Sequence, residues 1–181
     1  LDTEYLSNLI TPEILQEAII KNPDVKYLII VHYGGHSANM PEIMKICNQN
    51  SIKILEDAAH AFPAKLNGKM VGSFGDVTCF SFYANKTITT GEGGMLVTDN
   101  KEIYKRVKTM RLHGINKDIW DRFTAKTPSW EYDVVEAGYK YNMPDVNAAI
   151  GIGQLEQAEL FRQERQKAVE YYYKHLQQLD S

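Results

Sequence analysis

Cysteine is scarce in this sequence. The two cysteines, Cys47 and Cys79, do not form a CxxC pair, so neither a disulfide framework nor a zinc site is indicated. His32 and His36 are four residues apart, but the glycines between them argue against a pair of metal ligands on one helix face, and no acidic residue has the spacing of a third ligand. We therefore expect no metal site, and the cytoplasm as the compartment that fits best.

Long apolar runs and an excess of charge of one sign are also lacking. The longest apolar runs, such as residues 27–31 and 77–83, have the length of strands, and no signal-peptide pattern opens the sequence. The 20 basic and 23 acidic residues leave a formal net charge of -3. We therefore expect neither a nucleic acid nor a membrane as a partner.

What the sequence does have is enough apolar material for a core. The 181 residues are 44% hydrophobic, which is typical of one globular domain. The chain opens on Leu1 without a preceding Met, and its last helical pattern has no Gly or Pro stop signal. We interpret it as a fragment of a longer protein.

Helical and strand patterns alternate along the chain. Thr11 and Pro12 predict the start of a helix, and Asn39 is a candidate cap for a second one. Short apolar runs at residues 26–31 and 51–56 predict strands after each helix. Further strands are expected at 77–83 and 95–98, and further helices at 101–112, 145–157 and 160–179. The alternation indicates an α/β fold with a mostly parallel sheet flanked by helices.

Polar side chains follow three of these strands. Residues 56–60 read EDAAH, so a strand would deliver two carboxylates and a histidine into a loop. Residues 80–86 read FSFYANK and end in a lysine, and residues 90–94 read TGEGG, whose glycines permit tight turns. The carboxyl ends of strands are where α/β sheets gather functional groups. We therefore expect the chemistry at this edge.

The three motifs, in this order, resemble the DegT/DnrJ/EryC1/StrS family of sugar aminotransferases. The resemblance extends to VHYGG at 31–35, RLHG at 111–114 and GYKYNMPD at 138–145, and covers most of residues 26–157. His113-Gly114 with Trp120-Asp121-Arg122 looks most like the members that aminate a 4-keto nucleotide sugar. The resemblance implies fold type I, the aspartate-aminotransferase fold, of enzymes that depend on pyridoxal 5'-phosphate (PLP).

The resemblance also implies a domain organisation. Residues 1–157 would form the central part of the PLP-binding large domain, whose N-terminal part is missing. Residues 158–181 would form a linker helix toward a missing C-terminal small domain. The full-length protein is expected to be a homodimer, and the fragment alone is expected to be inactive and to hold PLP weakly or not at all.

Five residues take roles from the family. Lys86 occupies the position of the lysine that binds PLP as a Schiff base and then moves a proton as the catalytic acid and base. Asp57 matches the carboxylate that pairs with the pyridine nitrogen, His60 a residue beside the cofactor ring, and Ser81 a hydroxyl that donates to the phosphate. Asn142 is the candidate for the residue that reaches the phosphate of the neighbouring subunit, and Lys140 is the second choice there.

The resemblance predicts a PLP-dependent aminotransferase that moves an amino group from glutamate to a nucleotide-linked keto sugar, for cell-surface polysaccharide or antibiotic sugar biosynthesis. A dehydratase of the family would have a histidine where this chain has Lys86. The alternative is a binding or regulatory module without turnover.

Taken one at a time, these residues also have simpler interpretations. A lysine after a strand is usually a solvated surface residue, and Asp57 could be a loop cap. His60 and Ser81 could be residues that only satisfy local hydrogen bonds. The glycines at 91–94 favour turn geometry over a phosphate cradle, and the glycines at 151 and 153 lie in a helical pattern that follows no strand, so we reject a dinucleotide site there.

Overall fold

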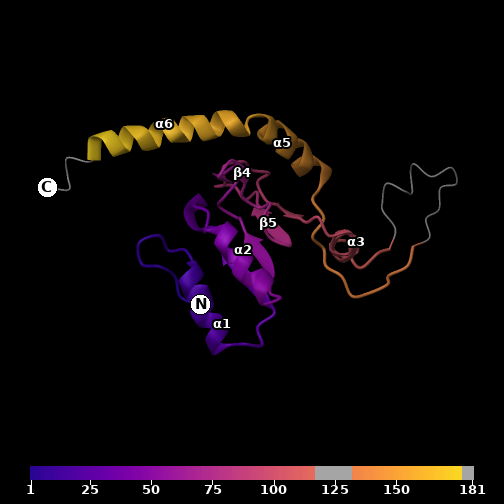
Figure 1. The fold of residues 1–181 in the computed structure, drawn as a ribbon. Coiled ribbons are helices and arrows are strands. Elements are labelled where there is room, and N and C mark those ends of the chain that lie inside the picture. The colour runs from indigo at the N-terminus through magenta and orange to yellow at the C-terminus, as the bar shows by residue number, and fades with distance from the viewer. Residues whose placement is uncertain (117–131, 177–181) are drawn as a thin grey trace. The chain divides into compact units, whose positions relative to one another are not determined.

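The structure is a computed structural model, which describes residues 1–116 and 132–176. Two compact units divide the chain: Leu1–Val97 with Asp145–Ser181, and Thr98–Pro144. The helices of the described chain are α1 Pro12–Lys21, α2 Met40–Gln49, α3 Lys101–Met110, α5 Asp145–Glu156 and α6 Ala158–Leu176, with a short 3-10 turn, η1, at Tyr33–Gly35. The strands are β1 Tyr27–Val31, β2 Lys53–Asp57, β3 Lys65–Leu66, β4 Lys69–Met70, β5 Val77–Ser81 and β6 Gly94–Val97 (Figure 1).

The first two helices begin where the sequence predicts, but only one has the predicted cap. The Thr11 side chain accepts a hydrogen bond from the Ile14 N–H at 3.4 Å, with Pro12 at the first helical position. Asn39 stands before α2, yet its side chain makes no capping bond. Pro41 explains the difference in part, since it removes one of the two N–H groups that a cap usually binds.

The four-stranded sheet of the first unit has the order β1-β2-β5-β6. β1, β2 and β5 are parallel, and β6 runs antiparallel to β5. The α/β fold with a mostly parallel sheet is therefore confirmed. The reversed direction of β6 follows from its connection, because the chain turns back directly after the loop at residues 82–93 without a crossover helix.

The core lies between this sheet and the helices α1 and α2, which pack against each other (Figure 1). Alternate residues of β1 point toward them, so Leu28 and Ile30 are buried while Tyr27, Ile29 and Val31 are exposed. The buried cluster also includes Leu15, Met40, Ile43, Ile46, Cys47, Ile52 and Ile54. Cys47 and Cys79 are free thiols, and burial raises the pKa of Cys47 to about 11, so it stays protonated at neutral pH.

A small hairpin, β3–β4, was not predicted. Lys65 pairs with Met70 and Leu66 with Lys69. Asn67 and Gly68 connect the strands with positive φ angles of 52° and 80°. An Asn-Gly pair between two short strands is the strongest sequence signal for such a turn. The sequence contains this signal at Asn67 and Gly68, so the hairpin could have been predicted.

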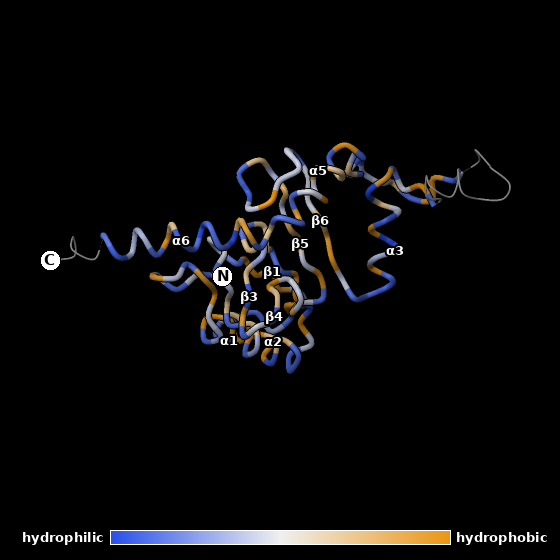
Figure 2. Tube along the Cα trace, turned by 90° about the horizontal axis from the view of Figure 1, so that it is seen from above, coloured by the Kyte–Doolittle hydropathy of each residue, from blue (hydrophilic) through white to orange (hydrophobic). Residues whose placement is uncertain are grey.

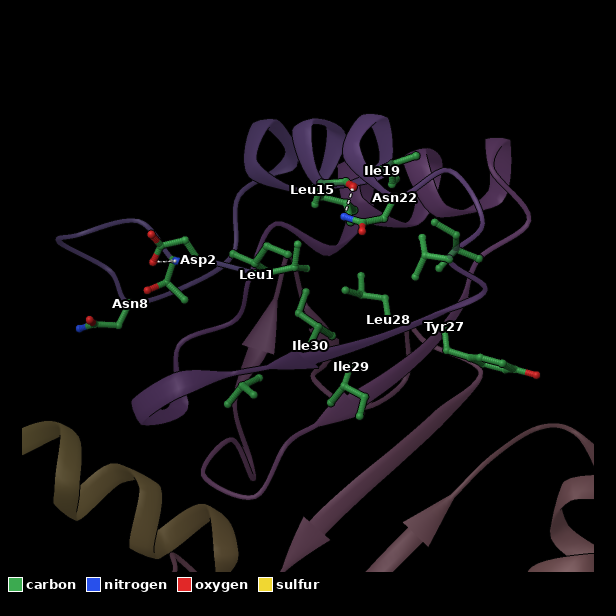
Figure 3. Close-up of a pocket in the computed structure, with 16 residues that line it drawn as sticks. Leu1, Asp2, Asn8, Leu15, Ile19, Asn22, Tyr27, Leu28, Ile29 and Ile30 are labelled. Atoms are coloured by element: carbon green, nitrogen blue, oxygen red, sulfur yellow. Dashed lines mark hydrogen bonds between the residues drawn. The ribbon is translucent and has the colours of Figure 1, made fainter.

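An apolar cavity of about 380 Å³ lies beside β1 and α1. Its walls come from the first ten residues, from Leu15 and Ile19 of α1, and from both faces of β1 (Figure 3). None of the five predicted site residues lines it. We assign it to packing along the edge of the sheet and not to chemistry.

The second unit, Thr98–Pro144, contains α3 and two isolated bridges. In α3, the Asn100 side chain accepts hydrogen bonds from the N–H groups of Glu102 and Ile103. Isolated bridges join Leu112 to Lys140 and Ile115 to Val134. The predicted Trp120-Asp121-Arg122 motif lies outside the described residues.

The described residues contain no candidate membrane span and no candidate metal site. No helix among them is long and apolar enough to cross a membrane. No group of three or more His, Cys, Asp and Glu side chains among them could hold a metal ion.

Candidate active site

Two predicted site residues lie on one face of the sheet, at the carboxyl ends of neighbouring parallel strands. Asp57 ends β2 and pairs in register with Cys79 of β5. Because strand side chains alternate between faces, Ser81, two residues after Cys79, lies on the same face as Asp57. Glu56 lies on the opposite face, toward the helices. The sheet thus brings one carboxylate and one hydroxyl to the edge where the motifs were expected.

A cavity of about 210 Å³ brings together three of the predicted residues. His60, Ser81 and Lys86 line it, together with Asn85. Arg165 of α6 also lines it, although the sequence analysis did not single this residue out. All of these residues belong to the first unit. Asp57 does not line this cavity.

Lys86 lies in a loop that is closed by backbone hydrogen bonds. The Thr90 N–H donates to the Phe82 carbonyl at 2.9 Å, and the Phe82 N–H donates to the Gly93 carbonyl at 2.8 Å. Within the loop, the Lys86 N–H donates to the Tyr83 carbonyl at 3.0 Å. Gly91 and Gly93 have positive φ angles of 79° and 151°, which confirms that the glycine cluster provides turn geometry.

Helix α5 holds the same loop from outside, a contact that the sequence analysis missed. The Asn147 amide donates to the carbonyl of Thr90 at 2.7 Å and to that of Glu92 at 3.2 Å. Gln154 accepts a hydrogen bond from the Thr89 N–H at 3.2 Å. The signal was the spacing, because residues seven apart share one face of a helix. Two polar residues on one face of a helix that is apolar between them, over residues 148–153, suggest a backbone partner.

His60 lies where two loops come into close contact. Gly35 has a φ of 88°, and a Cβ at this position would meet the His60 carbonyl oxygen at 3.1 Å. The VHYGG motif therefore uses glycine where the backbone approaches the EDAAH loop. Gly34 lines the cavity itself. The close approach of the two loops therefore places His60 beside Gly34 at the cavity.

Glu56 was predicted to enter the site loop together with Asp57, and this is wrong. Its side chain is fully buried on the core side of the sheet. The carboxylate accepts hydrogen bonds from the N–H groups of Gly72, Phe74 and Gly75 at 3.1, 2.9 and 2.6 Å. The alternation of β2 decides this, because adjacent residues of a strand face opposite sides.

His32 completes this buried cluster. Its Nε2 lies 2.9 Å from a Glu56 oxygen, and its Nδ1 accepts a hydrogen bond from the Ala38 N–H at 3.3 Å. Nδ1 is therefore unprotonated, and Nε2 donates to the carboxylate. Burial raises the pKa of Glu56, but the hydrogen bonds from His32 and the three N–H groups lower it more, so the net pKa is below the usual 4.5.

The residues present fit the PLP that the resemblance implies. Among the described residues Lys86 forms no ion pair, so its amine is available. The Ser81 oxygen accepts a hydrogen bond from the Tyr83 N–H at 3.3 Å, which leaves its hydrogen free to donate to a phosphate. One Asp57 oxygen accepts from the Ala59 N–H at 3.1 Å, and the other can accept from a ring nitrogen.

Asn142 lies in the second unit, whereas the residues of the cavity belong to the first. Its side chain accepts a hydrogen bond from the Lys140 amine, the second candidate for the same role. The loop that carries both is held at Tyr139 and Tyr141, whose rings stack with centroids 5.0 Å apart. The two candidates are therefore linked to each other. Their predicted contact with a neighbouring subunit stays a prediction.

Curated relatives of known sequence match most of this chain. An uncharacterised protein of Methanocaldococcus jannaschii is 47% identical over 171 residues, which are 94% of this chain and 44% of that protein. The spore coat polysaccharide biosynthesis protein SpsC of Bacillus subtilis is 39% identical over 170 residues, 94% of this chain and 43% of that protein. The chain thus spans less than half the length of these relatives.

Solved structures match the whole fold. PseC of Helicobacter pylori, an aminotransferase involved in the biosynthesis of pseudoaminic acid, superposes with a TM-score of 0.87 at 29% identity and covers 97% of this chain and 44% of its own. A mutant of GDP-4-keto-6-deoxymannose-3-dehydratase (ColD) with bound GDP-perosamine matches with a TM-score of 0.85 at 30% identity, over 100% of this chain and 47% of its own. Since the model of the DegT/DnrJ/EryC1/StrS aminotransferase family matches residues 1–181, the chain belongs to this family.

Proposed function

We propose that the protein containing this chain is a PLP-dependent aminotransferase that transfers the amino group of glutamate to a keto sugar linked to a nucleotide. The observation that supports this most directly is the cavity that Lys86 shares with Ser81 and His60. Covalent attachment of an aldehyde cofactor requires an amine that is not held in an ion pair. The Lys86 amine forms no ion pair among the described residues. It shares the cavity with a hydroxyl, at the carboxyl end of a parallel sheet.

Each residue has a separate task in this proposal. Lys86 would hold PLP through its amine and, once free of it, would carry a proton at Nζ as an acid and base. Asp57 would pair with the pyridine nitrogen, and Ser81 would donate a hydrogen bond to the phosphate. His60 would contact the ring. When bound, PLP supplies an electron-withdrawing ring conjugated with the reacting amino group.

The nature of the relatives supports a sugar as the acceptor. One acts in spore coat polysaccharide biosynthesis, and another in the biosynthesis of pseudoaminic acid. The dehydratase ColD is also similar to this chain, but family dehydratases have a histidine where this chain has Lys86, so the lysine favours amino transfer. We propose a role in cell-surface polysaccharide biosynthesis, in a cytoplasmic homodimer in which Asn142 contacts the phosphate of the partner subunit's site.

The test uses the full-length protein with PLP. We expect a visible absorbance band that disappears on addition of glutamate, and a mass increase on the peptide containing Lys86 after borohydride reduction. K86A and K86R should lack the trapped mass and should lower amino transfer at least about 1000-fold, since they remove both the attachment point and the proton carrier. K45A, which changes an exposed lysine of α2, is the control and should behave like the wild type.

The result also decides between the two classes of function. If the wild-type protein traps no cofactor at Lys86, or if K86A still transfers amino groups, the proposal is wrong. The binding or regulatory module, without turnover, would then be the function to pursue.

A further inference from the structure

Arg165 is the one residue of the cavity that comes from α6. This helix is long and mostly hydrophilic, as its largely blue tube in Figure 2 shows. Almost all of its described side chains are exposed. Arg165 is itself exposed, and it is the residue of this helix that reaches the cavity shared with Lys86 and Ser81.

The charges on α6 set Arg165 apart from its neighbours. Arg162 forms an ion pair with Glu159 at 2.6 Å, and Lys167 pairs with Glu164 at 2.6 Å. Arg165 has no acidic residue three or four positions away on the helix, the spacing that such pairs need. Among the described residues its guanidinium forms no ion pair and no hydrogen bond.

The cavity contains no negative charge to neutralise it. The titratable groups that line it, among the residues the structure describes, are His60, Lys86 and Arg165, and no Asp or Glu belongs to the lining. A guanidinium presents a planar fork of donors that matches a carboxylate or a phosphate with two parallel hydrogen bonds. Arg165 is exposed, so water solvates its guanidinium when the cavity is empty. An anionic group of a ligand that enters the cavity would gain this fork of donors.

We propose that Arg165 binds the α-carboxylate of the amino donor, an inference that rests on the proposed function. In the proposed function the amino group of an α-amino acid would have to approach Lys86, and the α-carboxylate is attached to the same carbon as that amino group. The phosphates of a nucleotide sugar lie farther from the reacting keto carbon, beyond the sugar ring. Arg165 is thus a residue that determines the donor.

The experiment compares R165Q and R165K with R162Q in the full-length protein loaded with PLP. R162Q is the matched control, because it removes a cation of the same helix that pairs with Glu159 and does not line the cavity. The first readout is the glutamate concentration that half-converts the absorbance of the bound cofactor. The second is the calorimetric Kd of glutarate, which carries carboxylates but no amino group. The third is the Kd of PLP, and the fourth is the KM of the nucleotide sugar.

We expect R165Q to weaken glutamate and glutarate binding about 10- to 100-fold, as loss of a charged, paired hydrogen bond does, with R165K between it and the wild type. PLP affinity, nucleotide-sugar KM and R162Q should stay within about twofold of the wild type. Unchanged glutamate and glutarate binding in R165Q would overturn the inference, and a selective loss of PLP or nucleotide-sugar affinity would assign Arg165 to a phosphate instead. If wild-type protein traps PLP at Lys86 and reacts with glutamate, either failure leaves the proposed function intact.

Discussion

Glu56 shows how one residue of a functional motif can serve the fold while its neighbour serves the chemistry. Its carboxylate joins His32 after β1, three N–H groups of residues 72–75, and the Thr78 hydroxyl of β5 at 3.2 Å. Three segments, which follow β1, precede β5 and begin β5, thus share one acceptor near the carboxyl end of β2. This cluster stabilises, from the core side of the sheet, the end of β2 that carries Asp57.

We predict that E56Q lowers the free energy of unfolding at pH 7 by about 3 kcal/mol, because an amide turns a donor toward groups that also donate, inside a buried cluster. Glu42 of α2 is exposed and pairs loosely with Lys45 at 3.9 Å, so E42Q is the control and should change stability by less than about 0.5 kcal/mol. Urea unfolding of both variants measures the difference. Equal stability of E56Q and the wild type would show that the cluster tolerates an amide.

The same cluster predicts a dependence on pH. Because the folded-state pKa of Glu56 lies below 4.5, the unfolded chain binds this proton more readily. The stabilisation by Glu56 is therefore complete above about pH 4.5 and is lost as the pH falls through the lower folded-state pKa. Urea midpoints measured from pH 6 downward should fall more steeply in the wild type than in E56Q. Parallel curves would contradict the assignment.

At the scale of the element, α5 stabilises the loop that carries Lys86. We predict that N147A and Q154A each destabilise the fold by about 1 kcal/mol, because the partly buried backbone groups of Thr90 and Thr89 lose a partner. Hydrogen exchange should accelerate in the peptide 82–93, and borohydride trapping of PLP at Lys86 should become slower.

The matched control for α5 is Q157A, since the Gln157 amide donates at 3.1 Å to the Gly153 carbonyl of its own helix and not to the loop. Exchange in peptide 82–93 should not change in this variant. If N147A and Q154A also leave that peptide protected, α5 does not hold the loop. The measurement therefore separates a general weakening of the helix from loss of the two contacts.

Most elements could be predicted from the sequence, because periodicity and caps such as Thr11 are local signals. The positions of Lys86, Ser81 and Asp57 at one edge followed from strand ends and from the family resemblance. The direction of β6 could not be read, since a short strand pattern is the same in both orientations. Arg165 was missed because its role depends on where α6 lies relative to a loop some 80 residues earlier in the chain, which no local pattern records.

At the scale of the whole molecule, β1 forms an edge of the sheet. It stands first in the strand order, and among the described residues it pairs only with β2. Ile29 and Tyr27 are 65% and 76% exposed, and Val31 is 46% exposed. An apolar edge strand pairs readily with other chains. The apolar cavity of Figure 3 lies beside the same strand, with Leu28, Ile29 and Ile30 in its wall.

We predict that the 181-residue chain associates at micromolar concentrations through β1, and that I29K shifts it toward the monomer, because a charged side chain on an edge strand opposes pairing. I20K is the control, since Ile20 is 79% exposed on α1 and away from the sheet edge. Sedimentation velocity over a range of concentrations measures the effect. Equal association of I29K and I20K would show that β1 is not the contact.

The relatives are more than twice as long as this chain, so we expect further segments of the longer protein to cover β1. In that protein I29K should lower the thermal midpoint by several degrees, as a buried charge does. An unchanged midpoint would show that the Ile29 face stays open to solvent.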